Sequence, residues 1–285
     1  MQEQQHPYRS NWRKASPHKP ERGGQLSPYP ATKFFDQLSF IGDRKYACFV
    51  LECSEGLILL DCLTRDPAHI TIIEQGMSDL GLDISRLKAI LITHGHGDHY
   101  GHADYFRQNY GAKIYMSQAD FQYARGANEP GDLFPDGPMS FEVDAFLEDG
   151  QSFSLGDTSI RIVGTPGHTP GCLSFLIPVT DEGRPHLIAL WGGTGIPKKR
   201  ERQEQYLQSW YRFADLTEEY GVDGEISNHP FVDMMIPRLE IVRNIVDGVP
   251  NPFVLGKNNY KYYEKSFRNM CVKKMQQPEE TCRNL

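Results

Sequence analysis

Short apolar stretches recur along this chain, separated by turn residues and by segments with a different hydrophobic period. Stretches of this length, bounded by Gly, Pro or acidic residues, predict buried β-strands. After Pro67, apolar positions from Ile70 to Leu80 recur every three or four residues, which predicts an amphipathic helix. Strands and helices together indicate an α/β fold. The expected strands are 33–41, 46–52, 57–60, 87–92 and 112–116, with short ones near 145, 153, 160, 175 and 189, and the further expected helices are 101–110, 202–220, 234–247 and 258–276.

The domain organisation follows from length and local composition. At 285 residues the chain can bury a sizeable core. Residues 1–30 are rich in proline, glutamine and charge, so we expect a poorly ordered lead-in there. No linker-like stretch or internal repeat follows, and residues 31–285 are therefore expected to form a single domain.

Composition and charge narrow the expected partners. No apolar run approaches the roughly 18 residues of a membrane span, so we expect no membrane insertion. A net charge of −7 argues against a nucleic-acid partner. The basic run 198–200 is most simply a solvated helix start, although it could attract an anionic substrate. We expect a small-molecule substrate, and the sequence leaves the oligomeric state open.

The chemistry is concentrated in Thr93–His99, which reads Thr-His-Gly-His-Gly-Asp-His and directly follows the apolar run 87–92. Three imidazoles and a carboxylate thus share one tight loop at the end of a strand. Gly95 and Gly97 let the backbone bend so that side chains two residues apart converge. Imidazole nitrogen and carboxylate oxygen are zinc ligands. A chance cluster of surface histidines would seldom combine these features, so we predict a divalent metal site.

Two later histidines are further candidate ligands. His168 stands at the centre of the turn Gly164–Gly171, which is rich in glycine and proline and lies between two strand-like stretches. Such a turn restrains a ligand side chain. His229 also follows a strand-like stretch, and Pro230 restricts its backbone. Alone, each would be read as an ordinary loop histidine; beside the first cluster, each becomes a candidate.

Together these motifs resemble the metallo-β-lactamase superfamily, over about residues 35–275. Within it, the third subclass of zinc β-lactamases is the most similar, because the expected ligands include no cysteine. The resemblance implies a four-layer αββα sandwich, in which two mixed sheets are flanked by helices and the ligand loops share one edge. It is carried by His-x-His-x-Asp-His at 94–99, Gly-His168-Thr-Pro-Gly, the late His229 and the upstream Leu-Ile-Leu-Leu-Asp61.

The resemblance also implies roles for the site residues and two Zn²⁺ per chain. A hydroxide held by the metals would attack a carbonyl carbon, because zinc lowers the pKa of water from about 15.7 to near 7. Asp98 would orient this nucleophile and is the expected catalytic residue. Asp61 is a candidate partner of a ligand imidazole, although it could equally be an aspartate that caps a turn at the strand end. The implied ligands are His94, His96 and His168 for one zinc, and Asp98, His99 and His229 for the other.

The loop after the late strand 187–190 departs from the family pattern. Many superfamily members place a metal-bridging aspartate there, but this chain continues as Trp-Gly-Gly-Thr-Gly without a carboxylate. In the lactamase subclass, a serine or threonine pair on this loop helps to bind the drug carboxylate. The corresponding positions are Gly193 and Gly195, with Thr194 between them. We expect these residues to contact substrate, where backbone N–H groups could replace the missing side chains.

Three functions remain open. The first is a dizinc hydrolase that opens a β-lactam or related cyclic amide and so confers antibiotic resistance. The alternative is a zinc-dependent hydrolase of another ester, lactone, amide or thioester with weak or no β-lactamase activity, which the glycine loop favours. The third is a non-catalytic zinc-binding protein, against which the complete ligand set argues. Hydrolysis of a substrate panel with chelated controls separates them.

The cellular compartment rests mainly on the resemblance. The first residues lack the apolar core of a secretion signal. Lactamase-like relatives are usually exported, however, so a periplasmic or secreted location is expected. Cys271 and Cys282 could form a disulfide, which would indicate an oxidising compartment. The other four cysteines lie in strand-like stretches, where cysteine serves as a small apolar residue.

Overall fold

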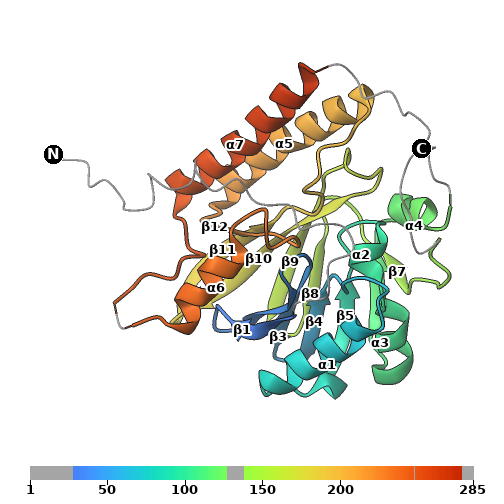
Figure 1. Ribbon diagram of the computed structural model, residues 1–285, viewed down its shortest axis with the longest axis vertical. Coiled ribbons are helices and arrows are strands. Elements are labelled where there is room, and N and C mark those ends of the chain that lie inside the picture. Colours follow the sequence, from blue (N-terminus) through green and yellow to red (C-terminus); the bar gives the residue numbers. More distant parts are fainter. Residues whose placement is uncertain (1–27, 127–137, 247, 278–285) are drawn as a thin grey trace.

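The computed structural model describes residues 28–126, 138–246 and 248–277. Two β-sheets pack face to face in the middle of the molecule, and helices cover both outer faces (Figure 1). This arrangement confirms the predicted αββα sandwich. Within the described part of the chain, no helix is both long and apolar enough to pass through a membrane.

Both sheets are mixed. The first contains, in spatial order, β1 (Pro28–Lys33), β2 (Leu38–Asp43), β3 (Ala47–Cys53), β4 (Gly56–Leu60), β5 (Leu87–Leu91), β6 (Lys113–Met116) and β7 (Ala145–Phe146). Pairing is antiparallel from β1 to β4 and parallel from β4 to β7. The second contains β12 (Gly224–Ile226), β11 (Arg184–Leu190), β10 (Leu173–Asp181), β9 (Thr158–Gly164) and β8 (Ser152–Leu155). There β11 and β12 run parallel, and the other neighbours run antiparallel.

The helices form two groups along the chain. Those of the first half are α1 (Ala68–Asp79), α2 (Gly97–Tyr100), α3 (Ala103–Tyr110) and α4 (Gln118–Ala124), with a 3₁₀ turn, η2 (Ile84–Arg86). Those of the second half are α5 (Arg200–Tyr220), α6 (Met235–Arg243) and α7 (Lys257–Met275). α1 and α3 lie against the first sheet, whereas α5 and α7 lie side by side across the second (Figure 1).

Strand β3 shows how the sequence builds two core layers at once. Side chains alternate between the two faces of a strand. Phe49 and Leu51 therefore join the core between the sheets, while Cys48 and Val50 join the core under α1. All four are completely buried. A third cluster lies beneath α5 and α7, so each interface between layers has its own apolar core.

Two expected elements are wrong in their bounds. The segment 33–41 is not one strand, because the chain turns after β1 and re-enters the sheet as β2. The N–H groups of Phe34 and Phe35 both donate to the carbonyl of Leu38, at 3.1 and 3.2 Å, which closes this turn. The turn contains the polar pair Asp36 and Gln37, but the apolar residues on both sides of it give the segment the pattern of one strand. The helix expected over 234–247 ends at Arg243, and the apolar residues beyond it are exposed.

Other predictions fall partly or wholly on residues outside the described ranges. β1 begins at Pro28, inside the segment 1–30 that was expected to be a lead-in; residues 1–27 lie outside the described residues. The glycine- and proline-rich segment 126–140, whose composition predicts a loop that could lie over the site mouth, also falls mostly outside them. Cys271 is buried, but Cys282 lies outside the described residues, so their disulfide stays a prediction.

Candidate metal centre

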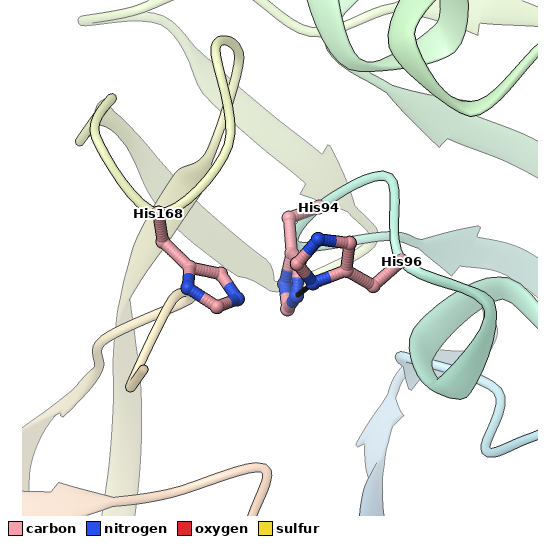
Figure 2. A group of neighbouring side chains, drawn as sticks. All are labelled: His94, His96 and His168. Carbon is pink, nitrogen blue, oxygen red and sulfur yellow. Dashed lines mark hydrogen bonds between the residues drawn. The ribbon is translucent and has the colours of Figure 1, made fainter. Parts of the chain in front are cut away.

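The predicted ligands lie on three loops that leave the ends of strands. Residues 94–99 follow β5, His168 lies between β9 and β10, and His229 follows β12. Figure 2 shows the imidazoles of His94 and His96, from one loop, and of His168, from another, pointing toward one another. Two loops come from the second sheet and one from the first, so the site depends on how the sheets pack.

The motif 94–99 changes conformation in its middle. His96 is extended, with φ −88° and ψ 146°, and the short helix α2 begins at the next residue. This change separates His94 and His96 from Asp98 and His99, so that the motif serves two neighbouring groups of ligand atoms. Gly95 is required, because a Cβ there would lie 2.7 Å from the carbonyl oxygen of Asp120.

The first group consists of His94, His96 and His168. One ligand atom from each lies within 4.8 Å of the others. In this group, His94 Nε2 and His96 Nδ1 are 3.1 Å apart. Two nitrogens bound to one zinc at about 2.0–2.1 Å in a tetrahedron lie about 3.3 Å apart. This pair is therefore spaced as two ligands of a single ion would be.

The second group contains Asp98 and His99. Asp98 Oδ1 lies 3.5 Å from His99 Nε2, and Asp98 Oδ2 lies 3.8 Å from His229 Nε2. Ligand atoms of His94, Asp98 and His99 also lie within 4.8 Å of one another. His229 approaches Asp98 but is not a member of this compact group. All six expected ligands thus lie close together, although His229 belongs to neither compact group and approaches Asp98 and His99.

Hydrogen bonds on the far side of the rings orient these imidazoles. His168 Nδ1 donates to the carbonyl of Gly195 at 2.7 Å, and His229 Nδ1 donates to the carbonyl of Lys45 at 3.1 Å. Each bond leaves Nε2 without its proton and free to act as a ligand.

His99 gives the sharpest sign that the site fits a metal ion. Its Nδ1 donates to Asp61 Oδ2 at 2.7 Å, so its Nε2 is the remaining ligand atom. That Nε2 is buried and has no hydrogen-bond partner among the described residues. A buried polar atom without a partner costs free energy, and a metal ion would satisfy this one.

Asp61 connects the ligand loops beneath the site. Its backbone has a positive φ of 59°, which is unusual for a residue with a side chain. Oδ1 accepts from the Thr93 N–H at 2.7 Å, and Oδ2 accepts from the Thr93 hydroxyl at 2.8 Å as well as from His99. Asn228 Nδ2 donates to the same oxygen at 3.1 Å and to the carbonyl of Gly192 at 2.9 Å. Asp61 thus lies where the sequence suggested a partner of a ligand imidazole.

The surroundings hold most of these histidines neutral. Burial lowers the pKa of His94 well below its usual range, and the neighbouring His99 and His168 lower it further. Desolvation also lowers the pKa of His168 and of His229. His99 differs, because Asp98 and Asp61 outweigh the effect of burial and raise its pKa. A neutral imidazole is the form that binds metal, so the cluster is largely ready to do so.

The glycine loop packs against a ligand instead of projecting side chains. A Cβ on Gly193 would lie 2.5 Å from the Cβ of His168, and one on Gly195 would lie 2.9 Å from its Cε1. The carbonyl of Gly193 accepts from the Trp191 indole at 2.6 Å, and that of Thr194 accepts from the Tyr206 hydroxyl at 3.3 Å. The loop therefore packs against His168, and a side chain at Gly193 would require His168 to shift.

Several residues at the site were not found from the sequence. Asp120 bonds to two ligand loops, Asn228 bonds to Asp61, and Tyr123 Oη lies 3.3 Å from His96 Nε2. The sequence held one local signal, because Ser117 stands three residues before Asp120 and caps α4. That spacing predicts a helix start. It says nothing of a contact with residues 95 or 169, which only the tertiary structure creates.

Comparison with known proteins also identifies a metal-dependent hydrolase fold. Residues 41–181 match the metallo-beta-lactamase superfamily. A probable polyketide biosynthesis zinc-dependent hydrolase from Bacillus velezensis is 37% identical over 115 residues, which are 39% of this chain and 43% of that protein. A hydroxyacylglutathione hydrolase from Haemophilus influenzae is 33% identical over 104 residues, 33% of this chain and 46% of that protein. The chain covers 32%, 43% and 55% of the length of the first curated relatives that it matches.

Among solved structures, a subclass B3 metallo-beta-lactamase of Bradyrhizobium japonicum is similar over most of the chain. The two share 25% sequence identity with a TM-score of 0.76, and the match covers 88% of this chain and 95% of that one. The family match ends at residue 181, and the structural similarity extends the common fold into the second half of the chain.

Proposed function

This chain contains a metallo-β-lactamase superfamily domain, and on that premise we propose that it is a dizinc hydrolase of small-molecule acyl compounds. The superfamily is one of metallo-hydrolases. The observation that carries the proposal is the meeting of two ligand groups around His94, next to the buried Nε2 of His99, which has no hydrogen-bond partner among the described residues.

Each side chain has a definite part in this proposal. His94, His96 and His168 would hold one zinc, and Asp98, His99 and His229 the other. Zinc bound there supplies Lewis acidity and lowers the pKa of water, so that a nucleophile exists near neutral pH. Asp98 accepts a hydrogen bond from the attacking water and so aims it at the carbonyl carbon. Asp61 keeps the His99 ring in place.

The proposed substrate is a β-lactam or a related cyclic amide. The main support is the absence of a carboxylate after β11. A side chain at Gly192 would place its Cβ 1.8 Å from the Leu173 carbonyl oxygen, and one at Gly193 would meet His168. An aspartate at either of these two positions would therefore require the loop to move, and no residue of 192–195 carries a carboxylate. Asp98 then stays as the acidic ligand, which is the lactamase-like arrangement.

The alternative is hydrolysis of another ester, lactone, amide or thioester. The same loop favours it, because neither Gly193 nor Gly195 offers a side chain to hold a drug carboxylate. Two relatives are named as hydrolases outside the lactamases, for hydroxyacylglutathione and in polyketide biosynthesis. The alternative shares the metal centre and differs only in what the loop admits.

Hydrolysis by zinc-loaded protein tests the proposal. We expect turnover of a chromogenic cephalosporin that a chelator abolishes and added zinc restores. A kcat/KM of about 10⁴ M⁻¹s⁻¹ or more would be that of a working β-lactamase. Turnover orders of magnitude weaker, together with faster cleavage of a lactone, ester or thioester, would establish the alternative. Zinc binding without turnover of any compound in the panel would contradict both.

Replacing Asp98 by asparagine separates metal binding from catalysis. We expect Asp98→Asn to retain at least one zinc but to lose about 100-fold in kcat, since the orienting carboxylate becomes a neutral amide. Zinc content and kcat are measured on the same preparation. Asp104→Asn is the control, because Asp104 pairs with Arg107 on the outside of α3. Unchanged kcat in Asp98→Asn would exclude the catalytic role.

A further inference from the structure

A carboxylate that belongs to none of the ligand loops bonds to two of them. Asp120 lies in the first turn of α4 and is completely buried. Its Oδ2 accepts from the Gly95 N–H at 2.8 Å and from the Thr169 hydroxyl at 2.6 Å. Its Oδ1 accepts from the Gly171 N–H at 2.6 Å. Gly95 separates two ligands, and Thr169 directly follows a third.

Through these bonds, Asp120 connects a loop of the first sheet to a loop of the second. His94 and His96 follow β5 of the first sheet, whereas His168 lies between two strands of the second. A metal held by all three needs the two loops at a fixed separation. One backbone bond also joins the sheets nearby, from the Leu173 N–H to the Thr93 carbonyl at 2.8 Å. On the side of the second sheet, Asp120 binds Thr169, which directly follows His168, whereas Leu173 lies further along the chain from that ligand.

Glycine lets both loops approach α4 closely. A Cβ on Gly95 would lie 2.7 Å from the Asp120 carbonyl oxygen, and one on Gly171 would lie 2.6 Å from the Asp120 nitrogen. One turn further along α4, Tyr123 Oη lies 3.3 Å from His96 Nε2. Both ligand loops therefore contact the first turn of α4.

We propose that Asp120 is a positioning residue for the first metal, because its carboxylate sets the separation of His94 and His96 from His168. This inference rests on the proposed zinc binding. The three bonds of the carboxylate all go to the ligand loops, whereas the Asp120 N–H is capped at 3.1 Å by the Ser117 hydroxyl. Loss of the carboxylate therefore leaves the start of α4 intact and acts on the loops.

The test is the affinity of each zinc site in Asp120→Asn. Asparagine has the same shape, but its NH₂ group must face a donor, either Gly171 on one side or Gly95 and Thr169 on the other. We expect the affinity for one of two zinc ions to fall by about 10- to 100-fold, the usual effect of removing a partner behind the ligands. The other ion should bind as in the unaltered protein. Metal-free protein is titrated with Zn²⁺, and with Co²⁺, whose visible spectrum reports the ligand geometry.

Two further variants make the result specific. Thr169→Val removes one of the three bonds without changing the shape of the side chain, so we expect a smaller loss at the same metal. Asp144→Asn is the matched control, because its carboxylate also accepts a backbone N–H, from Ile114 at 2.8 Å, but within the described part of the chain it has no hydrogen bond to a ligand loop. Its two zinc affinities should not change.

The outcomes are distinct. If Asp120→Asn bound both zinc ions with unchanged affinity, the inference would be overturned. The proposed function would still stand, provided that the unaltered protein binds two zinc ions and is active. An equal loss at both sites would also overturn it, since that is the effect of general destabilisation. If the unaltered protein bound no zinc, the proposed function and this inference would both fail.

Discussion

Replacement of His96 by alanine is expected to abolish hydrolysis and to remove about one zinc ion per chain, while the protein stays folded. His96 Nδ1 lies 3.1 Å from His94 Nε2, so the first group would be left with two imidazoles and an open gap. The ring is only partly buried and lies on a loop, so its loss leaves the three apolar cores intact. Zinc content after dialysis, kcat/KM and circular dichroism are measured together.

His102→Ala is the matched control for this variant. His102 lies six residues further on, and its Nε2 bonds to the carbonyl of Asp66 at 2.8 Å, away from the ligand groups. That variant should keep its zinc and its rate. Near-normal hydrolysis by His96→Ala would refute the assignment of the first site.

The second large effect is a loss of stability when Arg238, a buried residue of α6, is replaced. Arg238 is almost completely buried, and its Nη1 donates to Glu225 Oε1 at 2.6 Å and to Asp233 Oδ2 at 3.1 Å. Its guanidinium also lies 4.0 Å from the ring centroid of Phe253. Arg238→Ala leaves two buried carboxylates without their cation, and we expect the free energy of unfolding to fall by about 3–5 kcal/mol. Urea unfolding measures this.

This loss should depend on pH. Burial raises the pKa of Glu225, and burial together with Glu225 raises that of Asp233 well above its usual range. In Arg238→Ala we expect the pKa values of both carboxyl groups to rise further, because Arg238 lowers them in the unaltered protein. An acid whose pKa is higher in the folded state adds stability at low pH, and this is lost as the pH rises through the folded pKa. The deficit of Arg238→Ala should therefore be larger at about pH 8 than at about pH 5.

Two variants control this experiment. Arg243→Ala removes an exposed arginine from the same helix and should change stability by about 0.5 kcal/mol or less. Adding Glu225→Gln to Arg238→Ala should recover part of the loss, because one of the two buried carboxylates left without their cation is then replaced by a neutral amide. A deficit that is independent of pH would mean that lost packing against Phe253, rather than unpaired charge, explains the effect.

Much of the fold could be predicted from hydrophobic spacing alone. α1, β5 and α7 lie within about two residues of their expected bounds, because each has a clear apolar period. The turn at 34–37 is marked in the sequence only by the polar pair Asp36 and Gln37, and the apolar residues on either side of that pair point into the core between the sheets, so the segment resembles one strand. The helix α4 was also not expected. The αββα arrangement came from the resemblance to a family, and the structure confirms it.

The sequence by itself determined which atoms could bind a metal. The order His-x-His-x-Asp-His, with glycines between, places ligand atoms within reach of one another over a few residues, whatever the rest of the chain does. Only the tertiary structure decided how those ligands are held. Asp120 meets Thr169, and Asp61 meets Asn228, across 49 and 167 positions of sequence. Such contacts follow from the packing of the two sheets, and no local pattern encodes them.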